Sequence, residues 1–321
     1  MAKVQVSFGK PSKVASKFVS ARANHGESAE KLKRAGVVNP VVSINTERAF
    51  TEALTNVQTW IRDAHKTGGI PEGFPVSLAT LTRNSAEQFL EERKEQGCGQ
   101  KTLDRDRHAL EFAIQEKLDV VKSVQGSKGE LASLPRAYTF EQMKAIASVQ
   151  SEKNALMTEI AYYAGLRAHE GFTIRPEFMV RQFNDRNWSE HMFKGRERGV
   201  FYIVKGKGGL QRRVMLPKDL AVRLQDLAFD RPRVVFDRER GIIYKDVHYD
   251  LGAGKNWSRS FARAAQKVLG WSRGAHGLRH SYVQNRMSEL DAVRVSHRES
   301  LRAVANEVGH FSEKTTYTYL R

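Results

Sequence analysis

The segment Ala275–Met287 reads AHGLRHSYVQNRM and places His276, Arg279 and His280 within five positions. If the segment is helical, His276 and Arg279 lie three residues apart and project from one face. The apolar residues between them could pack on a core while the basic side chains face a cleft. A surface helix with scattered basic residues explains these positions equally well, so the rest of the chain has to decide between the two readings.

Length and composition describe a soluble globular protein. The chain has 321 residues, enough for two domains, and 40% of them are hydrophobic and 28% charged. The sequence contains neither an apolar run of about 20 residues nor an apolar signal core, which predicts a cytoplasmic protein without a membrane partner. Cys98 is the single cysteine, so an intramolecular disulfide and a cysteine-based zinc site are excluded.

The charge of the chain indicates a polyanionic partner. Lys and Arg number 53 against 36 Asp and Glu, a formal net charge of +17. Residues 137–321 hold 32 of these cations and 20 of the anions, so +12 of the excess lies in the second part of the chain. Nucleic acid is the most common partner of such a surface, and simple solubility is the alternative.

The first part of the chain has the pattern of a helical bundle. We expect residues 1–42 to form a basic N-terminal arm containing one short helix that Gly36 ends. Residues 43–124 form a predicted helical DNA-binding domain, and the Ser-, Gly-, Lys- and Pro-containing stretch 125–136 is the predicted linker. The helices expected in the bundle cover residues 44–65, 85–95 and 101–117.

The second part, residues 137–321, has the pattern of a mainly helical domain. Two apolar runs, 200–204 and 213–216, flank the glycine-rich sequence KGKGGLQR and predict a β-hairpin. The predicted fold class is therefore mainly α with a small antiparallel β-sheet. The polar stretch 231–255 has no assigned role. The helices expected here begin at Thr139 and Asn154 and cover residues 218–229, 257–269, 278–290 and 300–308.

Five short motifs of this second domain carry side chains suited to phosphoryl transfer. In chain order they are GLRAHE, KGKGG, HGLRH, VGH and TTYTY. Together they resemble the signature of the tyrosine recombinase (phage integrase) family: an arginine, a hairpin lysine, His-x-x-Arg, a second histidine and a nucleophilic tyrosine. The resemblance covers the chain from about residue 137, and the preceding bundle is similar to the core-binding domain of the family. The matching residues are Arg167, Lys207, His276, Arg279, His310 and Tyr319.

The resemblance gives the two arginines and the lysine defined roles. Attack on a DNA phosphodiester builds negative charge on the non-bridging oxygens, and without a metal ion this charge requires fixed cations. Arg167 and Arg279 are the expected bidentate clamps. Lys207, on the hairpin, is the expected general acid for the leaving 5′ oxygen, with Lys205 as its rival.

The remaining motif residues are expected to activate and position the nucleophile. A tyrosine with its reference pKa of about 10 needs a neighbouring base, and His276 can accept its proton. His310 is expected to hydrogen-bond the scissile phosphate, and Glu170, three residues after Arg167, to orient the arginine–histidine pair as a hydrogen-bond acceptor. Tyr319 follows His310 by nine positions, as in the family pattern, whereas Tyr317 is interpreted as a packing residue.

Other basic residues are weaker candidates for binding DNA. Lys101, Arg105 and Arg107 lie on the outer face of a predicted helix, where a solvated surface is the alternative. Arg212 and Arg213, beside the hairpin, are expected to touch the DNA backbone or solvent rather than the reacting phosphate.

We expect neither a cofactor nor a metal ion. KGKGG lacks the spacing and the Ser/Thr of a P-loop. His276 and His280 have the i, i+4 spacing of a zinc pair, but the glutamate of the HExxH motif and a third ligand are missing.

The resemblance implies a site-specific DNA recombinase. Such an enzyme cleaves and rejoins double-stranded DNA through a 3′-phosphotyrosyl intermediate and a Holliday junction. The implied partners are recombination sites on duplex DNA, three further copies in a homotetramer, and an accessory DNA-bending or directionality factor. Type IB topoisomerase activity and a non-catalytic DNA-binding role are the alternatives.

Overall fold

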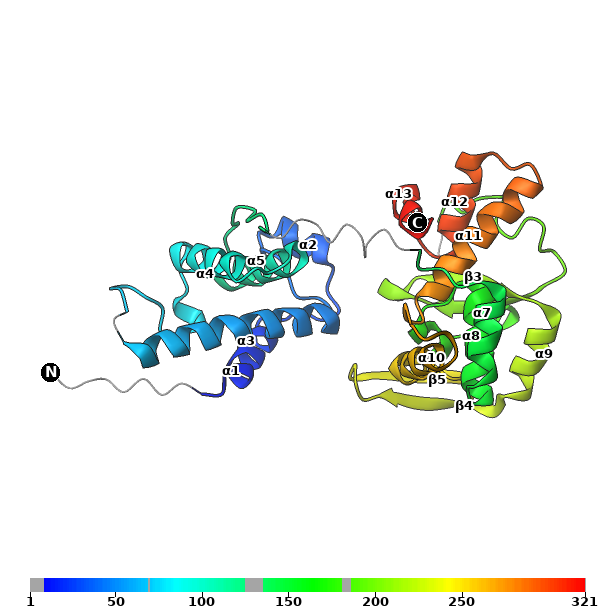
Figure 1. Cartoon of the computed structure of the whole chain (residues 1–321), viewed down its shortest axis with the longest axis horizontal. Coiled ribbons are helices and arrows are strands. Elements are labelled where there is room, and N and C mark those ends of the chain that lie inside the picture. The colour runs from blue at the N-terminus through cyan, green and yellow to red at the C-terminus, as the bar shows by residue number, and fades with distance from the viewer. Residues whose placement is uncertain (1–8, 69, 125–134, 181–185, 321) are drawn as a thin grey trace. The chain divides into compact units, whose positions relative to one another are not determined.

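The computed structural model describes residues 9–68, 70–124, 135–180 and 186–320 (Figure 1). The chain divides into two compact units, unit 1 (Met1–Ala132) and unit 2 (Ser133–Arg321). Most of the predicted linker, residues 125–136, lies outside the described residues. None of the described helices is long and apolar enough to cross a membrane.

Unit 1 is a helical bundle built around one long helix. Ser43 caps that helix by accepting a hydrogen bond from the backbone N–H of Thr46, and its apolar stripe from Phe50 to Ile61 is buried. The three helices predicted here are confirmed within a few residues at their ends. The elements are α1 (Pro11–Ser20), α2 (Ala29–Arg34), α3 (Ile44–Thr67), η1 (Leu78–Thr80), α4 (Arg83–Glu95) and α5 (Gln100–Ile114).

The predicted basic arm over residues 1–42 is wrong for the part that the structure describes. Helix α1 begins with Pro11 in its first turn, and Ala15 and Val19 have no exposed surface. These residues are four positions apart, so they lie on one face and pack in the same core as Leu54 of α3. The short helix predicted in this region is α2, and Gly36 follows it with a φ of +86°.

Unit 2 packs its helices around a core that includes Trp257 and Phe261 of α10. Thr139 and Gln142 form the predicted capping box at its first helix. The α-helices are α7 (Phe140–Ser148), α8 (Glu152–Ala164), α9 (Lys218–Asp226), α10 (Gly254–Leu269), α11 (Gly277–Ala292), α12 (His297–Glu307) and α13 (Glu313–Thr316). The 3-10 turns are η2 (Ala168–Phe172), η3 (Glu177–Met179), η4 (Lys207–Gly209) and η5 (Tyr317–Tyr319).

The predicted hairpin is present as part of a three-stranded antiparallel sheet. Its strands, in spatial order, are β1 (Arg175–Pro176), β2 (Val200–Lys205) and β3 (Gln211–Leu216). Lys205 pairs with Gln211, so the turn η4 lies at the tip between β2 and β3. The predicted fold class, mainly α with small antiparallel sheets, is confirmed.

A second antiparallel pair was not predicted. Strands β4 (Ala228–Asp237) and β5 (Ile242–Tyr249) form a two-stranded ribbon along one edge of unit 2 (Figure 1). Helix α9 ends at Asp226, so the predicted helix 218–229 extends too far. The pairing register shifts twice between Ala228 and Val235 and disturbs the alternation that marks a strand.

Candidate active site

Four segments of unit 2 bring the predicted catalytic side chains together. Arg167 precedes η2, His276 and Arg279 lie at the start of α11, His310 follows α12, and Tyr319 lies in η5. Helix α8 ends at a glycine, Gly165, with a φ of +60°, and an added Cβ would lie 2.6 Å from the Tyr282 ring. A side chain at this turn would therefore be strained and would clash, which explains why a glycine leads into the Arg167 segment.

Arg167 connects Glu170 with His310. Its Nη1 donates to Glu170 Oε1 over 3.0 Å, and its Nη2 donates to His310 Nε2 over 3.0 Å. A guanidinium can only donate, so Nε2 of His310 accepts and the imidazole proton lies on Nδ1. That Nδ1 is buried and has no hydrogen-bond partner among the described atoms. His310 is thus left with a donor that a phosphate oxygen could accept.

Arg279 lies beneath the ring of Tyr319. The side chain has no exposed surface, and its guanidinium carbon is 5.8 Å from the centre of the tyrosine ring. Its two terminal nitrogens donate to the backbone carbonyls of Gly165 and Val308, while Nε has no partner in the described residues. Burial, followed by repulsion from Arg212, lowers the pKa of Arg279 to about 10, so it remains a cation at neutral pH.

Glu170 is the buried anion of the site. It accepts from Arg167 on one oxygen, and Arg212 Nη2 lies 2.6 Å from the other. Burial alone would raise the pKa of Glu170, but the charges of Arg212, Arg279 and Arg167 outweigh it and lower the pKa to about 2. Glu170 therefore stays ionised beside Arg167 and Arg212, and its role in orienting Arg167 stays a prediction.

The expected location of Arg212 at the DNA backbone or in solvent is wrong. Only 1% of the residue is exposed, and besides Glu170 it donates to the backbone oxygen of Glu307 over 2.5 Å. A buried guanidinium needs an anion and further acceptors, and Glu170 with the surrounding carbonyls supplies them. Arg213, its neighbour, is exposed and pairs with Glu177.

Three histidine rings surround Tyr319. Their centres lie 4.6 Å (His280), 5.5 Å (His310) and 5.6 Å (His276) from the centre of the tyrosine ring, which is itself only 7% exposed. Desolvation by the surrounding protein, with the nearby arginine charges, lowers the pKa of each histidine to about 4, although His276 is partly open to solvent. All three are therefore neutral at pH 7, and a neutral His276 can accept a proton.

His280 is the residue at this site that the sequence reasoning missed. It was considered only as a zinc ligand, yet its ring is the nearest of the three to Tyr319 and 5% of it is exposed. The signal was available, because His280 follows His276 by one helical turn and therefore shares its face. Tyr317 is also placed differently from its prediction, since it is 50% exposed rather than packed in a core.

The turn expected to carry the catalytic lysine passes next to the arginine–glutamate pair. A Cβ added to Gly206 would lie 2.9 Å from Glu170 Oε1 and 3.5 Å from Arg167 Nη1. Lys207 follows directly as the first residue of η4, although its side chain is outside the described part of the structure. The rival residue, Lys205, is the exposed last residue of β2. The backbone therefore keeps Lys207 close to the site.

The DNA-contact candidates of unit 1 are mostly engaged in ion pairs. Arg105 binds both Glu52 and Asp106, and Arg107 binds Glu111 over 2.6 Å. Lys101 is exposed at the start of α5. Contact with DNA at these three positions remains a prediction.

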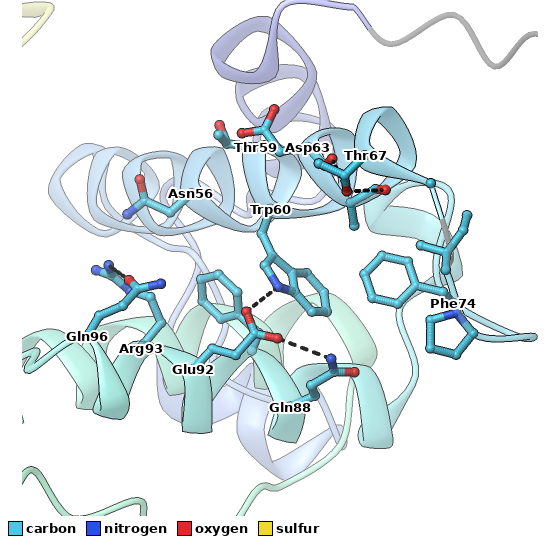
Figure 2. Close-up of a pocket in the computed structure, with 15 residues that line it drawn as sticks. Asn56, Thr59, Trp60, Asp63, Thr67, Phe74, Gln88, Glu92, Arg93 and Gln96 are labelled. Carbon is cyan, nitrogen blue, oxygen red and sulfur yellow. Dashed lines mark hydrogen bonds between the residues drawn. The ribbon is translucent and has the colours of Figure 1, made fainter.

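A pocket of about 640 Å³ in unit 1 lies between α3 and α4 (Figure 2). Trp60 projects into it and donates to Glu92 over 2.7 Å, and Gln88 donates to the other oxygen of Glu92. Its cation, Arg93, is paired with the buried Asp106. The pocket lacks the convergent cations of unit 2 and is not the candidate catalytic site. Among the residues that the structure describes, no three His, Cys, Asp or Glu side chains are grouped to hold a metal ion.

Comparison with solved structures identifies the fold as that of the tyrosine recombinases. The XerH site-specific recombinase bound to palindromic difH substrate in a post-cleavage complex is 16% identical, with a TM-score of 0.58 over 97% of this chain and 91% of that chain. Its pre-cleavage complex with difH gives a TM-score of 0.56 at 16% identity, over 97% and 90% of the two chains. No family model matches the sequence, and no curated protein matches it.

Proposed function

We propose that this protein is a member of the tyrosine recombinase family and a site-specific DNA recombinase. The observation that carries the proposal is the convergence on Tyr319 of Arg279, His276 and His310, with Arg167 hydrogen-bonded to His310. These residues come from four separate segments, and each fits a step of metal-independent phosphoryl transfer. The likeness in fold to XerH, a recombinase bound to its DNA substrate, supports the proposal.

The first step is attack of the Tyr319 oxygen on a DNA phosphorus. His276 accepts the phenolic proton, and Arg167 and Arg279 stabilise the charge that develops on the non-bridging oxygens. The Nδ1–H of His310 donates to one of those oxygens. The bond from phosphorus to the 5′ oxygen breaks, and Lys207 supplies a proton to that oxygen.

The product of this step is a 3′-phosphotyrosyl ester and a free 5′ hydroxyl. The ester conserves the bond energy of the phosphodiester, so a 5′ hydroxyl from a second duplex can attack it without ATP. Lys207, which gave up its proton in the first step, accepts the proton of that hydroxyl, and His276 returns a proton to the Tyr319 oxygen as its bond to phosphorus breaks. Two such exchanges pass through a Holliday junction, and we propose that four copies of the chain assemble on two DNA sites, with an accessory factor setting direction.

The proposal is tested by recovering DNA that is covalently attached to the protein in cells containing its native genomic neighbourhood. Tyr319→Phe removes the attacking oxygen, and Tyr317→Phe is the matched control because Tyr317 is half exposed. We expect fragments joined through their 3′ phosphates at a recurring sequence with the wild type and with Tyr317→Phe. Tyr319→Phe should yield none.

Other outcomes would contradict the proposal in distinct ways. Attachment scattered uniformly over the genome, with relaxation of a plasmid that lacks the recurring sequence, would indicate a type IB topoisomerase. DNA binding without any covalent attachment by the wild type would indicate a non-catalytic DNA-binding protein. Loss of attachment with Tyr317→Phe, and not with Tyr319→Phe, would show that Tyr317 is the nucleophile and that the prediction of Tyr319 is wrong.

A further inference from the structure

The β4–β5 ribbon is a substantial part of unit 2 that the proposed chemistry does not use. It comprises ten residues in β4 and eight in β5. Phe236 and Ile243 lie opposite each other in the pairing register, and both are more than half exposed. A two-stranded antiparallel ribbon of this kind has the width that the major groove of DNA admits.

The ribbon is firmly attached to the segment that carries Arg167 and Glu170. Tyr244 of β5 stacks on Phe172 of η2 with ring centres 4.6 Å apart. His169 Nδ1, also in η2, lies 3.3 Å from the carboxylate of Asp237 at the end of β4. The ribbon therefore projects from the catalytic segment itself rather than from a remote part of the unit.

Two carboxylates of the ribbon form ion pairs with the rest of unit 2. Glu239, in the turn, pairs with Lys255 and Arg259, and Asp246 pairs with Arg175 of β1. Asp237 faces His169, whereas Asp230 is exposed. These ion pairs offset part of the negative charge of the ribbon.

Three cations of the ribbon are exposed and without an ion-pair partner among the described residues: Arg231, Arg238 and Lys245. Lys245 follows Ile243 by two positions, so both lie on the outward face of β5. These unpaired cations make the exposed surface of the ribbon complementary to a phosphate backbone.

A pocket of about 330 Å³ joins this surface to the hairpin that carries Lys207. Ile243 and Lys245 of the ribbon form one wall, and Lys205 and Gln211, at the ends of β2 and β3, form another. A duplex bound at the Lys207 hairpin would therefore lie beside the ribbon.

We propose that the β4–β5 ribbon is a second DNA-binding element, whose exposed cations bind duplex phosphates next to the one that reacts. The proposal rests on the proposed function, because it requires duplex DNA at the Lys207 hairpin. It assigns Arg231, Arg238 and Lys245 to DNA binding and not to chemistry. Their contacts add affinity and fix the position of the duplex relative to η2.

The test measures binding of the full chain to a fluorescein-labelled, mixed-sequence duplex by anisotropy across a series of salt concentrations. Tyr319→Phe serves as the parent so that cleavage does not interfere. The test variant adds Arg231→Ala, Arg238→Ala and Lys245→Ala. The control variant adds Lys218→Ala, Lys267→Ala and Arg298→Ala, which removes the same charge from exposed positions without ion-pair partners in the described structure.

We expect the test variant to bind roughly 100-fold more weakly than the parent at about 0.1 M salt, and its log–log salt slope to fall by about 2 to 3. Circular dichroism should show unchanged helix content in both variants. Arg238→Ala and Lys245→Ala alone should each lower the slope by about 1, which keeps the test valid if the triple variant is unstable.

Several results would overturn the proposal. A test variant with the same salt slope and duplex affinity as the parent would overturn it. An equal loss of affinity in the control variant would also overturn it, because the effect would then come from net charge alone. Unchanged DNA binding with loss of assembly in sedimentation would make the ribbon a surface for a second copy. A parent that binds no duplex, together with absence of covalent attachment in cells, would instead overturn the proposed function.

Discussion

Replacing Glu170 with glutamine removes the carboxylate that Arg167 and Arg212 share and keeps the shape of the side chain. The pKa of Glu170 falls from 4.5 to about 2 in the folded protein. This difference corresponds to about 3 kcal/mol of folding stability at pH 7, because the folded state binds the proton less tightly than the unfolded state. Leaving the buried Arg212 and the partly buried Arg167 without their anion has a similar cost, about 3–5 kcal/mol.

The sign of the pH dependence follows from the same pKa. A carboxylate with a depressed folded pKa contributes its full stability above the unfolded value of 4.5, and this contribution is lost as the pH falls toward 2. The free energy of unfolding of the wild type should therefore exceed that of Glu170→Gln by about 3 kcal/mol at pH 7, by about 2 kcal/mol at pH 3.5 and by less than about 1 kcal/mol at pH 2.5.

Urea unfolding, followed by tryptophan emission, measures this difference at each pH. Glu190→Gln is the control, since the Glu190 side chain is 88% exposed and should change stability by less than about 0.5 kcal/mol. A Glu170→Gln protein as stable as the wild type at pH 7, or a difference that does not shrink in acid, would refute the assigned role of the buried anion.

Three further predictions concern the surroundings of the nucleophile. Gly165→Ala should lower the free energy of unfolding by about 2–4 kcal/mol, because the backbone there has a positive φ and the added Cβ would clash. Gly270→Ala is the control, since Gly270 also has a positive φ but lies in open space, and thermal melts should show a loss of about 1 kcal/mol. NMR titration of the free protein should show His276, His280 and His310 gaining protons only near pH 4, and midpoints near 6.5 would contradict the effect of desolvation and of the nearby arginines on their pKa values. His280→Gln should slow covalent DNA attachment roughly 10- to 100-fold at saturating DNA with unchanged duplex affinity, while an unchanged rate would deny it a role in positioning the tyrosine.

The elements that could be predicted are those whose signal is local. The apolar stripe of α3 repeats with the helical period from Phe50 to Ile61, and the KGKGG turn lies between two apolar runs. The catalytic candidates could be proposed because their order along the chain is itself a pattern. His276, Arg279 and His310 lie near Tyr319, and Arg167 is hydrogen-bonded to His310. Local periodicity and motif order do not depend on tertiary contacts.

The features that could not be predicted depend on contacts between distant segments. Arg212 looks like a surface residue beside Arg213, and only its pairing with Glu170, 42 positions earlier, buries it. Ala15 and Val19 lie among basic residues in the sequence, so their burial becomes visible only in the packing of α1 on α3. The β4–β5 ribbon has little burial of its own, so the hydrophobic alternation that identifies a strand is weak there.

The hydrogen bonds of Arg279 affect which residues of the site can be substituted during evolution. Its guanidinium donates to carbonyls that end two helices, Gly165 of α8 and Val308 of α12, so it fastens two parts of the chain besides facing the tyrosine. Tyr319 makes no comparable bridge with its side-chain oxygen in the described structure. Under the proposed function, related chains that stop exchanging strands should lose the tyrosine early and retain the arginine, because only the arginine also joins two helix ends.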